Sequence, residues 1–124
     1  MSKIPKALSP GEEALQLHLR AEKVLFIREY EFCPGRKWRF DFVLTGEEHR
    51  KIGIEIEGGV WSGGRHTRGK PFERDCEKHN MAVKLGWSVL RYSTDMVLAG
   101  DAINDILELV RPERANALRE EILA

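Results

Sequence analysis

Two carboxylates interrupt an apolar strand pattern in the segment IGIEIEGG, residues 52–59. Its isoleucines alternate with other residues, so one face of a strand would be apolar and the other would carry Glu55 and Glu57. A second alternating segment, WRFDFVL, places Asp41 among its polar positions. Carboxylates gathered on one face of a sheet suit a hard divalent cation, because Mg²⁺ and Mn²⁺ prefer oxygen ligands. The first chemistry that these residues predict is therefore metal binding.

The register of a hairpin between these two segments follows from their apolar alternation. Because side chains alternate with period two, only an even pairing sum puts both apolar sets on one face. Three apolar side chains of the first strand are expected to share that face: Phe40, Phe42 and Leu44. Phe42 then pairs with Ile54, and the same register sets Asp41 opposite Glu55, where like charges destabilise a sheet. A metal ion between the two acids would relieve the repulsion, and so would a structural salt-bridge cluster with Arg39 or a nearby lysine.

A glycine-rich, basic segment directly follows the acidic strand. GGVWSGGRHTRGK, residues 58–70, carries Arg65, His66, Arg68 and Lys70. Glycines let the backbone approach a bulky partner closely, and the cations suit phosphates. His66 could act as a general base or acid because imidazole titrates near neutral pH, or it could only contact a phosphate.

The first helix is expected to begin in the segment LSPGEEALQLHLR. Ser9 is a suitable N-cap, Pro10 suits the first helical position, and Glu12 lies three residues after the cap as a capping-box partner. Glu12 also precedes Leu15 and Leu19 at helical spacing, so it shares their inward face. Glu12 can therefore belong to a site beside the sheet or can simply complete the cap.

The remaining segments predict an α/β fold with a mixed sheet of about four strands flanked by helices. A second helix begins near Pro71 and is closed by Gly86, and Lys78 borders its buried side. The strand GWSVLRYS that follows is expected to run parallel to the acidic strand, because the helix between them can serve as a crossover.

Composition limits the class of protein. A chain of 124 residues with 42% hydrophobic content fits one domain, residues 1–124. Lys plus Arg and Asp plus Glu each number 20, so no overall charge draws the chain to nucleic acid or to a membrane. Nothing at the N-terminus has a secretory layout, and no apolar run approaches the length of a membrane span. We expect a cytoplasmic, intracellular protein with no membrane partner.

These motifs, in this order and spacing, resemble those of the PD-(D/E)XK nuclease superfamily. The acidic first helix, FDF, EIEGG, the basic glycine-rich loop, DCEKHN and GWSVLRYS all contribute, from Ser9 to Ser93. The similarity is greatest to small phage and bacterial endonuclease-like domains related to very-short-patch-repair endonucleases. Each motif alone is weak. The resemblance implies a restriction-endonuclease-like core, and a phage gene is one expected source.

The resemblance also implies a set of site residues. Asp41 takes the place of the metal-binding aspartate, and Glu55 takes that of the first acid of the (D/E)XK element. The carbonyl of Ile56 would be a further metal ligand, and Glu12 matches the glutamate of the first helix. The implied cofactor is Mg²⁺, for which Mn²⁺ would substitute.

The chain departs from the superfamily pattern at Glu57, where a lysine is expected. A glutamate cannot stabilise the attacking hydroxide or the negative charge of the transition state. We expect Lys78, on the following helix, to supply the missing cation, with Asp75 orienting it. Glu57 would then bind a second metal ion or hold Lys78 in place.

The function that these expectations support is metal-dependent endonucleolytic cleavage of DNA, with nicked, branched or mismatched DNA as candidate substrates. Four cations are expected to grip the DNA backbone: Arg39, Arg65, Arg68 and Lys70. Cutting both strands needs two sites or two visits, so a homodimer is one possible assembly. The alternatives are a DNA-binding module with a degenerate nuclease site, favoured by Glu57, and a protein unrelated to nucleic acid whose acids are structural.

Overall fold

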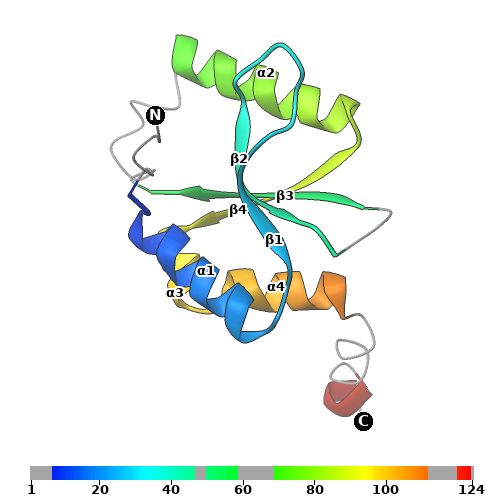
Figure 1. The fold of residues 1–124 in the computed structure, drawn as a ribbon. Helices are drawn as coiled ribbons and strands as arrows, with labels where there is room; N and C mark the ends of the chain where they lie inside the picture. The colour runs from blue at the N-terminus through cyan, green and yellow to red at the C-terminus, as the bar shows by residue number, and fades with distance from the viewer. Residues whose placement is uncertain (1–6, 47–49, 59–68, 112–119, 124) are drawn as a thin grey trace, which may run out of the picture.

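The sheet has four strands, and helices cover both of its faces (Figure 1). The structure, a computed structural model, describes residues 7–46, 50–58, 69–111 and 120–123. The elements in chain order are α1 (Pro10–Ala21), β1 (Phe26–Glu31), β2 (Arg39–Leu44), β3 (Lys51–Glu57), α2 (Lys70–Lys84), β4 (Trp87–Ser93), α3 (Thr94–Leu98) and α4 (Asp101–Val110). The α2 helix covers one face of the sheet, and α1, α3 and α4 cover the other.

The strand order is β1-β2-β3-β4, with antiparallel pairing except between β3 and β4, which are parallel. The α2 helix provides the crossover between these two strands and is followed by Gly86, whose φ of 87° suits the residue that ends a helix. The predicted mixed α/β architecture is confirmed. None of the helices in the described ranges combines the length and the apolar character that a membrane crossing needs.

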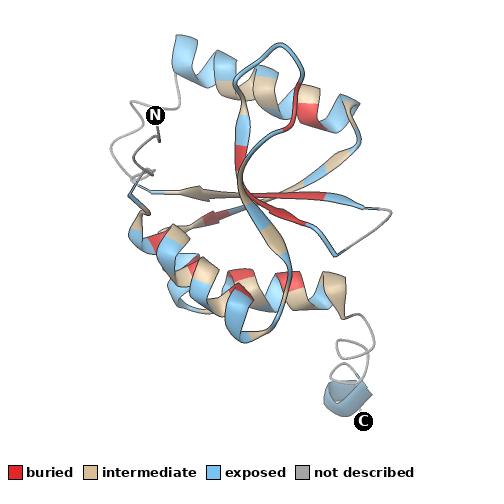
Figure 2. Cartoon of the chain, viewed as in Figure 1, coloured by how far each residue is buried: buried red, intermediate tan, exposed pale blue. Residues whose placement is uncertain are grey.

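The sheet divides the buried residues into two clusters (Figure 2). The cluster on the side of α1, α3 and α4 is the larger and includes Leu15, Leu19, Phe42, Ile54 and Ile106. The cluster on the side of α2 is rich in aromatic rings and includes Phe32, Phe40, Val43 and Ala82. Because each face of the sheet is packed, groups at the end of a strand pair are held between two rigid layers.

The expectation that Phe40 shares a face with Phe42 and Leu44 is wrong. Phe42 and Leu44 pack on the α1 side, whereas Phe40 packs on the α2 side and stacks on Phe32 with ring centroids 4.1 Å apart. The side chains of β2 therefore switch from one face of the sheet to the other between residues 40 and 42, and regular alternation fails there.

The neighbouring strand β1 changes faces at the same level. Arg28 lies against Phe42 on the α1 side, whereas Tyr30 contacts Trp87 in the cluster on the α2 side. Glu29, between them, has a φ of 54°, a left-handed conformation that is uncommon for a residue other than glycine. Such a residue bends a strand and redirects the side chains around it. Glu29 thus lies opposite Asp41 on the neighbouring strand, and a carboxylate oxygen of each lies within 4.8 Å of the other.

The close packing of Phe40 explains why β3 contains Gly53. A β-carbon added at Gly53 would lie 2.5 Å from Cδ2 of the Phe40 ring, which is too close for two carbon atoms. Gly53→Ala is therefore expected to lower the free energy of unfolding by about 1–3 kcal/mol, the usual cost of overpacking a core. Urea denaturation measures this loss. Gly46→Ala is the matched control, since its β-carbon would come no nearer than 3.9 Å to Leu25, and equal stability of the two variants would contradict the packing.

Candidate active site

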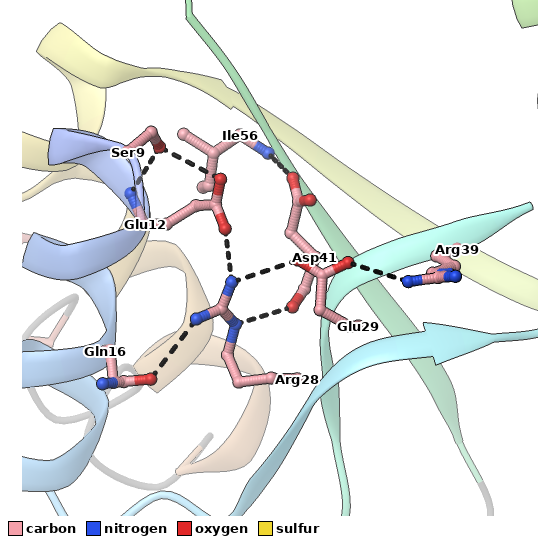
Figure 3. A network of polar contacts seen from close by, with 8 residues as sticks. All are labelled: Ser9, Glu12, Gln16, Arg28, Glu29, Arg39, Asp41 and Ile56. Carbon is pink, nitrogen blue, oxygen red and sulfur yellow. Dashed lines mark hydrogen bonds and ion pairs between the residues drawn. The ribbon is translucent and has the colours of Figure 1, made fainter. Parts of the chain in front are cut away.

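Three carboxylates from three different elements converge beside the sheet. Glu12 comes from α1, Glu29 from β1 and Asp41 from β2 (Figure 3). Each contributes one oxygen to a group whose members all lie within 4.8 Å of one another. We call these three residues the acidic cluster. Two of them were expected from the sequence, and Glu29 was not.

The N-terminus of α1 holds Glu12 in place. The Ser9 hydroxyl accepts a hydrogen bond from the backbone N–H of Glu12 at 3.2 Å and donates one to Oε1 of its carboxylate at 3.1 Å. The other oxygen, Oε2, contacts the guanidinium of Arg28. Only 12% of the Glu12 side chain is exposed. The cap and the site are therefore not exclusive alternatives, because one carboxylate serves both.

Asp41 reaches across to the backbone of β3. The predicted register is present, since Phe42 pairs with Ile54. The Asp41 carboxylate accepts a hydrogen bond from the Ile56 N–H at 2.8 Å, whereas the carboxylate of Glu55 contacts Lys78. The two acids that were expected to repel each other across the strands are thus each engaged with a donor.

The environment of Asp41 disfavours its ionised form. Burial raises the pKa of Asp41 most strongly, and the hydrogen bond from Ile56 lowers it in part. Neighbouring carboxylates raise the pKa further, in the order Glu12, Glu29 and Glu55. Glu55 was expected to be the main source of repulsion, but of the three carboxylates it raises the pKa of Asp41 least. A cation bound here would reverse the balance by favouring ionised Asp41.

The raised pKa of Asp41 predicts how pH affects the stability of the metal-free protein. The folded state binds the proton more tightly than the unfolded state, so this group destabilises the fold as pH rises above its unfolded value of 3.8. In EDTA, Asp41→Asn is therefore expected to be more stable than the wild type at neutral pH. The difference should vanish as pH falls towards 3.8, which thermal unfolding at several pH values would measure. A difference that is constant with pH would contradict this expectation.

A second group of charges lies next to the acidic cluster, around Glu55. The Nζ of Lys78 contacts Oε1 of Glu55, and only 21% and 13% of these two side chains are exposed. Lys78 therefore reaches the acidic strand, as its position at the border of the buried side of α2 predicts. Arg91 of β4 contacts Glu57 and also Asp75, the latter at 3.2 Å. Asp75 was expected to orient Lys78, and Glu57 was expected to hold Lys78 or to bind a second metal ion. The structure instead pairs both of these acids with Arg91.

The predicted DNA-binding cations lie at the surface where the structure describes them. Arg39 is half-exposed and lies 3.5 Å from Glu31 and 3.9 Å from Glu29, so it partly neutralises the rim of the acidic cluster. Lys70 begins α2, is highly exposed and contacts Glu73 at 3.6 Å. Arg65, His66 and Arg68 lie outside the described residues.

Sequence reasoning missed Arg28 and Glu29. Both lie in FIREYEF, where the apolar alternation is irregular. Arg28 occupies an inward position that an apolar side chain would normally fill, and its guanidinium lies 4.5 Å from the centre of the Phe42 ring. The signal that the sequence offered was the irregular apolar alternation of this segment, which follows the helix that carries Glu12.

The donor set of the acidic cluster fits a hard divalent cation. All of its candidate ligand atoms are carboxylate oxygens, as Mg²⁺ and Mn²⁺ prefer. One oxygen of each carboxylate lies within 4.8 Å of the others, which is close enough for contact with one ion. The pKa of Asp41 is raised mainly by burial and, to a smaller extent, by the neighbouring carboxylates. The described residues therefore offer a donor set that could hold such an ion.

One solved structure supports the fold directly. The chain is similar to the structure titled "Homing Endonuclease I-Bth0305I Catalytic Domain", with a TM-score of 0.59 and 18% sequence identity over 82% of this chain and 93% of that chain. No family model and no curated protein matches the sequence. At this identity the likeness shows a shared fold, and it confirms the predicted α/β fold with a four-stranded mixed sheet flanked by helices.

Proposed function

We propose that the protein is a metal-dependent DNA endonuclease. The observation that carries the proposal is the acidic cluster, which is built onto a fold shared with the catalytic domain of a homing endonuclease. A carboxylate cluster on an α/β sheet is not by itself a nuclease site. Its oxygen-only donors, together with Lys78 of α2, which contacts Glu55 on β3, make hydrolysis of a phosphodiester the best-supported reaction.

In this proposal the acidic cluster holds Mg²⁺ or Mn²⁺, with the Ile56 carbonyl as a further ligand. Such an ion, when bound, lowers the pKa of a water molecule and polarises a phosphate oxygen. Asp41 is proposed as the main ligand because the Ile56 N–H fixes one of its oxygens and one oxygen of it lies within 4.8 Å of an oxygen of each of the other two carboxylates. Glu12 and Glu29 supply the remaining charge.

Lys78 is proposed to stabilise the negative charge that develops on the phosphate. Its ammonium group is already placed by Glu55 and by the Phe40 ring, whose centroid lies 5.9 Å from Nζ. A fixed cation costs little reorganisation when charge develops, so it is effective in a transition state. Glu55 then acts by holding Lys78 and by adding negative charge beside the metal ligands.

The DNA would be gripped by exposed cations around the site, and His66 is proposed to assist proton transfer. Arg39 and Lys70 are accessible for phosphate contacts, and Arg65 and Arg68 are proposed to add to them. Because the net charge is zero, binding must depend on these local groups. Nicked, branched and mismatched duplexes are the substrates to compare, and a homodimer would bring two such sites together.

A DNA-binding module with a degenerate site is the second candidate. It is favoured by Glu57, which faces Arg91 instead of contributing a catalytic cation. Supercoiled plasmid incubated with the protein and Mn²⁺ separates the candidates. Nicking that EDTA abolishes supports the nuclease, whereas slower migration of intact plasmid supports the binding module. If neither appears, both candidates are wrong and the acids are structural.

A further inference from the structure

Arg28 places a guanidinium group inside the acidic cluster (Figure 3). It contacts two of the three carboxylates, Glu12 through Nη2 and Glu29 at 3.4 Å through the same nitrogen. Only 19% of the Arg28 side chain is exposed. A positive charge therefore lies permanently beside the place where a metal ion is proposed to bind.

Arg28 is also held by groups that carry no charge. Its Nε donates to the backbone carbonyl of Asp41 at 3.0 Å, and its Nη1 donates to Oε1 of Gln16 at 3.4 Å. The guanidinium lies over the Phe42 ring, with 4.5 Å between Cζ and the ring centroid. Since these contacts do not depend on the carboxylates, a cation that takes carboxylate oxygens would not release Arg28.

Internal donors already contact most of the carboxylate oxygens of the acidic cluster. Oε2 of Glu12 and Oε1 of Glu29 face Arg28, and Oδ2 of Asp41 accepts from the Ile56 N–H. Each carboxylate therefore has one oxygen committed to an internal donor. The second oxygen of Glu12 also accepts from the Ser9 hydroxyl, and that of Glu29 lies 3.9 Å from Arg39, so an ion would find at most monodentate contacts that compete with these donors.

We infer that Arg28 is a fixed internal counter-cation that limits the acidic cluster to one weakly held divalent ion. The inference rests on the proposed metal site and concerns how tightly, and how many, divalent ions that site binds. Like charges repel strongly at short range in a partly buried site, so the guanidinium lowers the affinity for the first ion and opposes a second. In the metal-free protein the same charge stabilises the three converging carboxylates.

Calorimetric titration with MnCl₂ alone, in the absence of DNA, tests this inference. The wild type is expected to bind one ion, and Arg28→Gln is expected to bind Mn²⁺ about tenfold more tightly or better, because the repelling charge is gone. Arg28→Lys keeps the charge, so its affinity should stay near the wild-type value. Arg36→Gln is the matched control: Arg36 is 54% exposed and pairs with Glu77, which is not part of the acidic cluster, so its removal should leave the Mn²⁺ affinity near the wild-type value.

Every outcome of this titration decides the inference. Equal or weaker Mn²⁺ binding by Arg28→Gln overturns it, as does an absence of binding in both proteins. If Arg28→Gln is unfolded without metal, Mn²⁺ should restore its circular dichroism, because an ion that binds only the folded state stabilises it, and failure to do so also overturns the inference. A wild type that binds Mn²⁺ as expected but leaves DNA intact disproves the proposed nuclease and leaves the inference standing.

Discussion

Asp41→Asn is expected to lower the single-turnover rate of metal-dependent DNA cleavage by about three orders of magnitude or more. The metal contributes several kcal/mol to the transition state, and each ~1.4 kcal/mol is a factor of ten in rate. Asp41 is one of the three carboxylates of the cluster, so losing its charge removes a proposed metal ligand. An asparagine can still accept the hydrogen bond from Ile56, so the strand geometry should persist. Quenched-flow cleavage of a labelled duplex at saturating Mn²⁺ measures the rate.

Glu31→Gln is the matched control for this substitution. Glu31 is a carboxylate on the same sheet, but it is 54% exposed and contacts only Arg39 among the pairs described. Its removal should leave the cleavage rate within about twofold of the wild type, as expected for an exposed ion pair. Cleavage by Asp41→Asn at the rate of Glu31→Gln would show that the acidic cluster is not the catalytic centre.

Lys78→Ala is expected to lower the cleavage rate by roughly two to three orders of magnitude, the scale for losing one stabiliser of transition-state charge. DNA affinity should change little, because a single cation contributes only a small part of phosphate binding. The half-buried position of Lys78 against Glu55 and Phe40 supports a fixed role. Single-turnover cleavage and filter binding on the same preparation separate the two effects.

Lys84→Ala controls for the general loss of a lysine from α2. Lys84 is the last residue of this helix and is exposed, so its removal should leave cleavage near the wild-type rate. Circular dichroism must show that both variants are folded. If Lys84 proves essential and Lys78 dispensable, the cation near Glu55 has only a structural role.

Much of the fold could be predicted because local patterns decide it. Isoleucine alternation predicts β3, the Ser9 cap predicts the start of α1, and Gly86 predicts the end of α2, all as the structure has them. The failure at Phe40 has a physical cause. The bend in the sheet depends on a left-handed conformation at Glu29, and nothing in a glutamate's local propensity favours a positive φ.

The site could be predicted only where its residues lie on regular elements. Glu12 and Asp41 have positions that helical and strand periods define, and both belong to the acidic cluster. Glu29 belongs to the cluster and Arg28 contacts it, and both lie at the bend of β1, where the left-handed conformation of Glu29 departs from regular alternation. Periodicity also cannot show that Asp41 turns towards the Ile56 N–H, since that depends on how far the two strands separate.

The most direct test follows cleavage and metal binding in the same protein across one range of Mn²⁺ concentrations. If the acidic cluster holds the catalytic ion, the single-turnover cleavage rate rises in proportion to the site occupancy measured by calorimetry, and both signals are lost in Asp41→Asn. DNA cleavage that persists in EDTA, or that reaches its full rate in Asp41→Asn, would contradict a metal-dependent nuclease site at Glu12, Glu29 and Asp41.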